Sequence, residues 1–136
     1  MIKIIYGGKG TGKTKRIIDV ANERGVNSPG DVIYLTDNSR HVSEVKYVIR
    51  YIDTTEYGIC DENGLLGFIR GLLAGNYDIK EIFIDGAVRM MNNNIEDMSH
   101  FMDELKSISE KSEVNFTLTI SRDLEEIPDF FKQYID

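Results

Sequence analysis

The sequence predicts an α/β protein, built as a three-layer α-β-α sandwich around a mainly parallel sheet of about five strands. Short apolar runs rich in Ile, Val, Phe and Tyr alternate along the chain with segments whose apolar residues recur at helical spacing. Strands that alternate with helices are joined by right-handed crossovers, which make the strands parallel and place helices on both faces of the sheet. Because the sequence has no internal repeat, low-complexity tract or linker, we expect residues 1–136 to form a single domain.

The first half of the chain is expected to supply three strands, at 2–6, 32–35 and 47–52. Each of these runs is short and rich in β-branched or aromatic residues. A helix is expected between the first two strands, ending at Gly25, because glycine readily adopts the left-handed conformation of a helix C-terminus. The polar residues that follow the second strand have helix-starting chemistry, so a short helix is expected over roughly 39–46.

The second half is expected to supply two more strands, at 80–84 and 114–120. Apolar residues recur at helical spacing over 65–73 and again over 95–108, where Asn94 is available as an N-cap. Each pattern gives one apolar face, so we expect two long helices packed on the sheet.

Two shorter segments complete the predicted elements. The asparagine-rich stretch 87–94 is expected to be a loop, and a short helix is expected around 129–134.

The turn after the first strand, with the sequence GGKGTGKT, fits the pattern G-x-x-x-x-G-K-[S/T] between a strand and a helix. Its glycines let the backbone curl until successive N–H groups point at one spot, and the following helix adds its positive dipole end there. The sequence therefore predicts a polyphosphate-binding loop. The residues expected to contact the phosphates are Gly7, Gly8, Lys9, Gly10, Thr11, Gly12, Lys13, Thr14 and Lys15.

Two of these residues have specific expected roles. Lys13 is expected to reach the β- and γ-phosphates, and the Thr14 hydroxyl to bind a Mg²⁺ ion that keeps water and phosphate oxygens as its other ligands. The strand at 80–84 leads directly into Asp85, and an apolar strand that ends in aspartate suits the carboxylate that holds Mg²⁺ opposite the loop. The sequence therefore predicts a magnesium site formed by Thr14 and Asp85.

Together, the loop and the Asp85 strand resemble the Walker A and Walker B motifs of the P-loop NTPase superfamily, over most of the chain. The resemblance implies the α/β fold of that superfamily and the binding of a Mg-nucleotide. GTPases of the superfamily carry an [NT]-K-x-D string, which this sequence lacks, and a D-x-x-G glycine, which does not follow Asp85. ATP is therefore the expected nucleotide.

Hydrolysis depends on which carboxylate activates water. Many ATPases of the superfamily place a glutamate directly after the Walker B aspartate, where this chain has Gly86. RecA-like ATPases, which the chain resembles most, place that carboxylate after the strand that follows the phosphate-loop helix, and Asp37 stands in the corresponding position. Three roles stay open for Asp37: catalytic base, substrate or Mg²⁺ contact, and helix cap. Glu56 is a second candidate for orienting water.

The sequence also shows two narrower resemblances. The chain is similar to small standalone bacterial P-loop proteins that are sometimes labelled twitching-motility ATPases, but a pilus-retraction motor needs a far longer chain and its own His-rich motifs. Thymidine kinase has an element comparable with Asp37 to Arg40, but the resemblance also implies a glutamate after Asp85 and a cysteine zinc site, which this chain lacks.

Three functions stay open. The leading expectation is slow, Mg-dependent ATP hydrolysis. The alternatives are a nucleotide-dependent switch or assembly module with little hydrolysis, and a small-molecule, nucleoside-type kinase that uses the segment 53–63 as its lid. Arg89 and Arg122 are expected either to sense the γ-phosphate or to be solvated surface residues.

The net charge of −7 makes a nucleic-acid partner unexpected, since nucleic-acid binding is driven by clustered Lys and Arg. No apolar run approaches the length of a membrane span, so no membrane partner is expected. Cys60 is the only cysteine, which is typical of a reducing compartment, and the protein is expected in the cytoplasm. A protein partner and self-association stay open.

Overall fold

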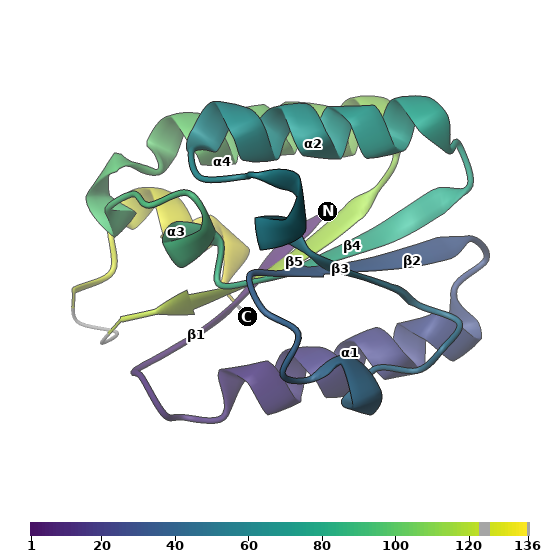
Figure 1. The fold of residues 1–136 in the computed structure, drawn as a ribbon. Coiled ribbons are helices and arrows are strands. Elements are labelled where there is room, and N and C mark those ends of the chain that lie inside the picture. Colours follow the sequence, from purple (N-terminus) through teal and green to yellow (C-terminus); the bar gives the residue numbers. More distant parts are fainter. Residues whose placement is uncertain (123–125, 136) are drawn as a thin grey trace.

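The computed structural model describes residues 1–122 and 126–135. It contains a five-stranded sheet in which every neighbouring pair of strands is parallel, in the order β1-β5-β4-β2-β3. The strands are β1 (Ile2–Gly7), β2 (Asp31–Thr36), β3 (Arg50–Asp53), β4 (Ile79–Asp85) and β5 (Asn115–Ser121). The predicted three-layer α/β fold is confirmed (Figure 1).

Helices cover both faces of the sheet. Helix α1 (Lys13–Asn27) lies on one face, and α2 (Glu62–Gly75) and α4 (Ser99–Ser112) lie side by side on the other (Figure 1). One-turn helix α3 (Ala87–Met90) follows β4. The short 3-10 helices are η1 (Val42–Glu44), η2 (Thr54–Tyr57), η3 (Ile95–Asp97) and η5 (Asp129–Tyr134).

Alternation along the strands divides the core into two layers, because successive side chains of a strand point to opposite faces. On β4, Ile82 and Ile84 pack toward α2 and α4, whereas Phe83 packs toward α1. On β2, Leu35 belongs to the first layer and Tyr34 to the second. These central strands are therefore apolar on both faces, as parallel strands covered by helices usually are.

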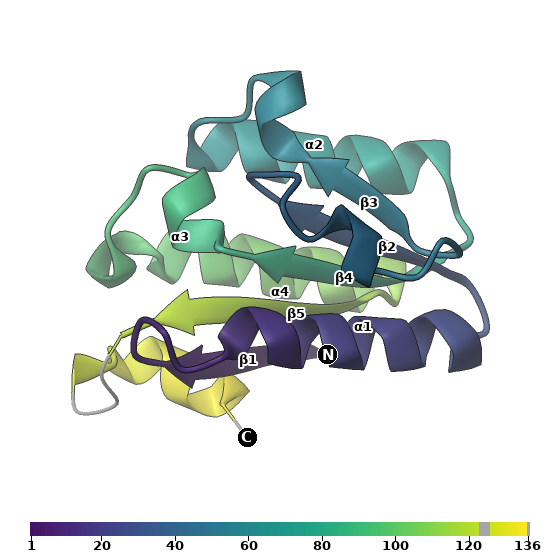
Figure 2. The ribbon, with the colours of Figure 1, turned by 60° about the horizontal axis from the view of Figure 1, so that its bottom comes forward.

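The register brings the carboxyl ends of the strands to one edge of the sheet. Gly7 at the end of β1 lies opposite Ser121 of β5, and Asp85 at the end of β4 lies opposite Thr36 of β2. In Figure 2, the loop between β1 and α1, the tip of β5 and helix α3 lie at the same end of the molecule. Since β5 separates β1 from β4, side chains of β5 lie between the loop and Asp85.

The prediction of a short helix over 39–46 is wrong. Only the 3-10 turn η1 forms there, and β3 begins at Arg50 rather than at 47. The side chain of Asn22 on α1 explains the difference, since it donates to the Glu44 carbonyl (2.9 Å) and accepts from the Lys46 N–H (2.8 Å). These bonds tie the segment to α1 in a non-helical conformation.

Helix α1 does not end at Gly25 but continues to Asn27. Gly25 is not among the glycines with positive φ. A Cβ atom at this position would lie 2.8 Å from Ile49 Cγ1, closer than side-chain atoms pack. Glycine therefore serves here to let the segment before β3 approach the helix.

Between β4 and α4 the structure differs from two expectations, a loop over 87–94 and Asn94 as the N-cap of the following helix. Gly86 has φ +87° and is followed by one helical turn, α3, inside the stretch expected to be a loop. The amphipathic helix starts at Ser99, after Met98, so Asn94 does not cap it and precedes η3 instead. The helix expected around 129–134 is present as the 3-10 helix η5.

Candidate functional site

The loop between β1 and α1 folds around the Gly8 carbonyl. The Thr11 hydroxyl and the Lys13 ammonium both donate to this oxygen, each at 2.7 Å. Gly10 and Gly12 have φ of +79° and +80°, a conformation that side chains other than glycine rarely adopt. Helix α1 begins directly after Gly12, so its unpaired N–H groups and positive dipole end face the loop.

Lys13 is buried against this loop. Burial lowers the pKa of its ammonium, and the neighbouring Asp85 carboxylate partly offsets that effect. The ammonium thus lies beside the loop backbone and near a carboxylate. A cation held in this way is ready to exchange the Gly8 carbonyl for a phosphate oxygen.

Asp85 accepts hydrogen bonds from three hydroxyl groups on three elements. They come from Thr14 on α1 (2.9 Å), Tyr34 on β2 (3.3 Å) and Thr119 on β5 (2.6 Å). Thr119 Oγ1 also accepts from the Gly86 N–H at 2.9 Å, so β5 connects both residues at the end of β4. The carboxylate is 6% exposed, and these donors stabilise it in a largely buried position.

Tyr34 is fully buried, and its ring stacks on Tyr51 with the centroids 5.4 Å apart. Burial raises the pKa of its phenol, and the adjacent Asp85 carboxylate raises it further. Tyr34 is therefore a hydroxyl donor to Asp85 and remains protonated at neutral pH. It was missed in the sequence, although a tyrosine inside a buried strand needs a partner for its hydroxyl.

Arg89 and Asp37 form a two-pronged ion pair at the same end of the sheet. Arg89 Nε and Nη2 donate to the two carboxylate oxygens of Asp37 at 2.7 and 2.9 Å. The hydrogen bonds from Arg89 hold the pKa of the Asp37 carboxyl below its ordinary value. The guanidinium lies against Gly86, where a Cβ atom would come within 2.2 Å of Nη2.

A cavity of about 310 Å³ lies between the loop, Asp85 and Arg89, and neither Asp37 nor Tyr34 lines it. Three cationic side chains and one carboxylate line it, so its local charge is positive in a chain whose net charge is −7. Such a site attracts anions. The lining residues are Lys9, Gly10, Gly12, Lys13, Thr14, Asp85, Arg89, Thr119 and Ser121.

The structure leaves other predicted residues outside this cavity. Lys15 is exposed on α1 and pairs with Asp19 at 3.1 Å, and Glu56 is exposed on η2, after the edge strand β3. Arg122 pairs with Glu96 rather than lining the cavity. Asp37 caps no helix, since the helix expected at 39–46 is absent and His41 precedes η1.

The Thr14 hydroxyl and the Asp85 carboxylate are the oxygen donors that suit Mg²⁺. The structure brings them within hydrogen-bond distance although they are far apart in the sequence. Among the described residues no group of three or more His, Cys, Asp or Glu side chains could hold a metal ion. A Thr–Asp pair fits an ion that takes its remaining ligands from phosphates and water.

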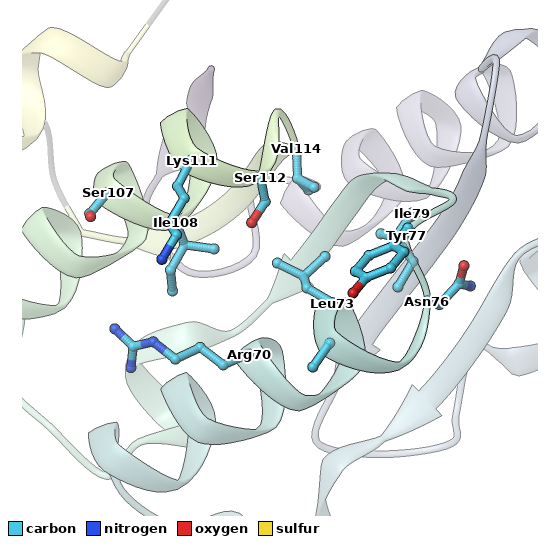
Figure 3. A pocket seen from close by; sticks show the side chains of 11 residues that line it. Arg70, Leu73, Asn76, Tyr77, Ile79, Ser107, Ile108, Lys111, Ser112 and Val114 are labelled. Carbon is cyan, nitrogen blue, oxygen red and sulfur yellow. The ribbon is translucent and has the colours of Figure 1, made fainter.

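Larger cavities lie elsewhere. One of about 500 Å³, at the amino ends of β4 and β5, is lined mainly by the ends of α2 and α4 (Figure 3). Apolar side chains such as Leu73, Ile108 and Val114 line much of it, and Arg70 at its margin pairs with Glu104. Neither this cavity nor the one between α2 and the edge of the sheet contains any residue of the loop.

Comparison with protein-family models and with curated protein sequences found no match. No described helix combines the length and the apolar character needed to cross a membrane.

Proposed function

We propose that this chain binds ATP with Mg²⁺ and hydrolyses it slowly. The observation that carries the proposal is the Thr14–Asp85 hydrogen bond beside the buried Lys13, at the mouth of a glycine loop that opens a helix. The resemblance to Walker A and Walker B motifs supports it as well. Loop N–H groups and Lys13 bind the phosphates, and Thr14 and Asp85 bind Mg²⁺, which would neutralise phosphate charge.

Slow turnover follows from the carboxylates near the site. Asp85 already accepts three hydroxyl hydrogen bonds, and Asp37 is paired with Arg89. The position after Asp85 is Gly86, which has no side chain, and Glu56 is outside the cavity. An attacking water would therefore be poorly oriented, and a well-placed base is typically worth 10²–10⁴-fold in rate.

The test is calorimetric titration of MgATP together with a phosphate-release assay. We expect binding by the wild-type protein and loss of both binding and release in Lys13→Ala. The matched control is Lys111→Ala, which removes an equal charge at the opposite end of the sheet. Absence of binding by the wild-type protein, or turnover equal to that of Lys13→Ala, would refute the proposal.

A second candidate function is a nucleotide-dependent switch or assembly module with little hydrolysis. The Asp37–Arg89 pair favours it, because among the described residues this pair engages a carboxylate near the site, other than Asp85, that could act as a base. Binding of MgATP without turnover, accompanied by an ATP-dependent change in mass in light scattering, would favour this function over the first.

Kinase activity has less support. Thr54, the second residue of the proposed lid 53–63, is buried, and its hydroxyl donates to the Thr36 carbonyl at 3.2 Å, so this end of the segment is fixed to β2. A cytoplasmic location remains part of the proposal, supported by the single cysteine.

A further inference from the structure

We infer that Arg89 distinguishes nucleoside triphosphates from diphosphates, and that Asp37 holds the Arg89 guanidinium when no terminal phosphate is present. This inference rests on the proposed function, because it adds a specificity-determining residue to the same site.

The first support is the way Arg89 binds its partner. Nε and Nη2 lie on one edge of the planar guanidinium and engage both Asp37 oxygens at 2.7 and 2.9 Å. Two oxygens of a phosphate group present the same spacing to that edge as a carboxylate does. Asp37 thus occupies the edge of the Arg89 guanidinium that a phosphate would use.

The second support is position. Arg89 lines the cavity together with Lys13 and Thr14, and its guanidinium bonds Asp37, which follows β2 on the side of β4 away from β1. The loop groups are suited to the phosphates nearest the α1 N-terminus. A guanidinium on the far wall is suited to a phosphate that projects further, as the terminal one of a triphosphate does. A diphosphate lacks that group.

The third support is that the ion pair can be exchanged. The Arg89 side chain is 56% exposed and that of Asp37 is 20% exposed, and ion pairs open to water contribute little net stability. A doubly charged phosphate competes well against one carboxylate for the same donors.

Two substitutions should change the ratio of MgATP to MgADP affinity in opposite directions, which distinguishes this arrangement from a purely structural ion pair. Arg89→Ala removes the group that contacts the terminal phosphate, so the ratio of MgATP to MgADP affinity should fall, by about tenfold for one charge-assisted contact. Asp37→Asn weakens the competing partner, so the same ratio should rise. If the ion pair were purely structural, the ratio of MgATP to MgADP affinity would change equally in both variants or in neither.

The experiment is calorimetric titration of MgATP and MgADP into the wild-type protein, Arg89→Ala, Asp37→Asn and Arg70→Ala. Arg70 is the matched control, because it also forms an ion pair but lies at the other end of the molecule. The ratio of MgATP to MgADP affinity in Arg70→Ala should equal that of the wild-type protein. If Arg89→Ala fails to fold, Arg89→Lys tests the same point, since lysine keeps the charge but cannot bind two oxygens side by side.

Two failures can be told apart. If the wild-type protein binds neither nucleotide, the proposed function fails and the inference falls with it. If it binds both and Arg89→Ala leaves the affinity ratio unchanged, the proposed function stands and the inference is overturned. An unchanged ratio in Asp37→Asn overturns the holding role of Asp37.

Discussion

The two ends of the parallel sheet are built differently. At the carboxyl end, a cavity of about 310 Å³ is lined by two lysines, an arginine, an aspartate and hydroxyl side chains, and two threonine hydroxyls donate to the aspartate. At the amino end, the cavity between α2 and α4 is larger, about 500 Å³, but apolar residues form much of its wall (Figure 3). Arg70, at its margin, is paired with Glu104.

Under the proposed function, the site lies in the smaller of these two cavities, so cavity size is a poor guide to its position. All five strands point their carboxyl ends to one edge, where loops and helix N-termini supply N–H groups and polar side chains. The amino ends receive the C-termini of α1, α2 and α4. The resulting prediction is that substitutions at the amino end change stability alone, whereas those at the carboxyl end also change nucleotide binding.

The largest expected effect is on stability at the amino end. Ile79, at the start of β4, is 2% exposed, and Ile79→Ala removes most of a buried side chain and leaves a void. We expect the free energy of unfolding to fall by about 3 kcal/mol with no change in MgATP affinity of the folded protein. Urea denaturation and calorimetry measure the two quantities. Tyr77→Ala, at a neighbouring residue that is 89% exposed, should change neither quantity.

The next effect is on binding at the carboxyl end. Asp85→Asn removes the charge of the proposed metal ligand, so MgATP affinity should fall about tenfold. With EDTA present, the variant and the wild type should bind ATP alike. Asp78→Asn makes the same chemical change just before the amino end of β4 and is the control. Equal losses in both variants would contradict the contrast between the two ends.

A smaller effect is expected at Tyr34. Tyr34→Phe keeps the stacked ring but removes the hydroxyl that donates to Asp85 at 3.3 Å. The free energy of unfolding should therefore fall by about 1 kcal/mol. Thermal or urea denaturation measures this. Tyr51→Phe, which loses a hydrogen bond to the Asn38 carbonyl further from Asp85, tests whether any effect on MgATP affinity is specific to Tyr34.

The smallest expected effect is a shift in titration. Arg89 holds the pKa of Asp37 below its ordinary value, so the ion pair stabilises the fold at neutral pH. That contribution is lost as the pH falls through the lowered pKa, below the ordinary range of an aspartate. In Arg89→Ala the pKa of Asp37 should return toward its ordinary value. Carboxyl carbon chemical shifts measured against pH would show this, and an unchanged curve would count against the pairing.

The strands and the main helices could be predicted because their signals are local. Apolar periodicity located all five strands within a few residues, and the loop pattern together with Asp85 identified residues that the structure brings together. The segment 39–49 could not be predicted in this way. Its conformation depends on Asn22, a residue of α1 whose side chain bonds the backbone at Glu44 and Lys46.

The rest of the site depends on strand order, which a single sequence does not specify. Tyr34 reaches Asp85 because β2 lies beside β4, and Thr119 does so because β5 lies between β4 and β1. Arg89 reaches Asp37 because α3 turns back over the end of β2 after the left-handed Gly86. Each of these contacts joins residues that are far apart in the sequence, so neither helical nor strand periodicity could have predicted it.

The pairing of β1 with β5 also has a consequence for the order in which the chain folds. Within the described residues, β5 is the strand that forms a ladder with β1, with Ile2 opposite Phe116, so this ladder cannot form until nearly the whole described sequence has left the ribosome. Such distant pairings also slow folding. Under the proposed function, a nucleotide would therefore not stabilise a partly synthesised chain through a preformed loop, and it would act only on the finished sheet.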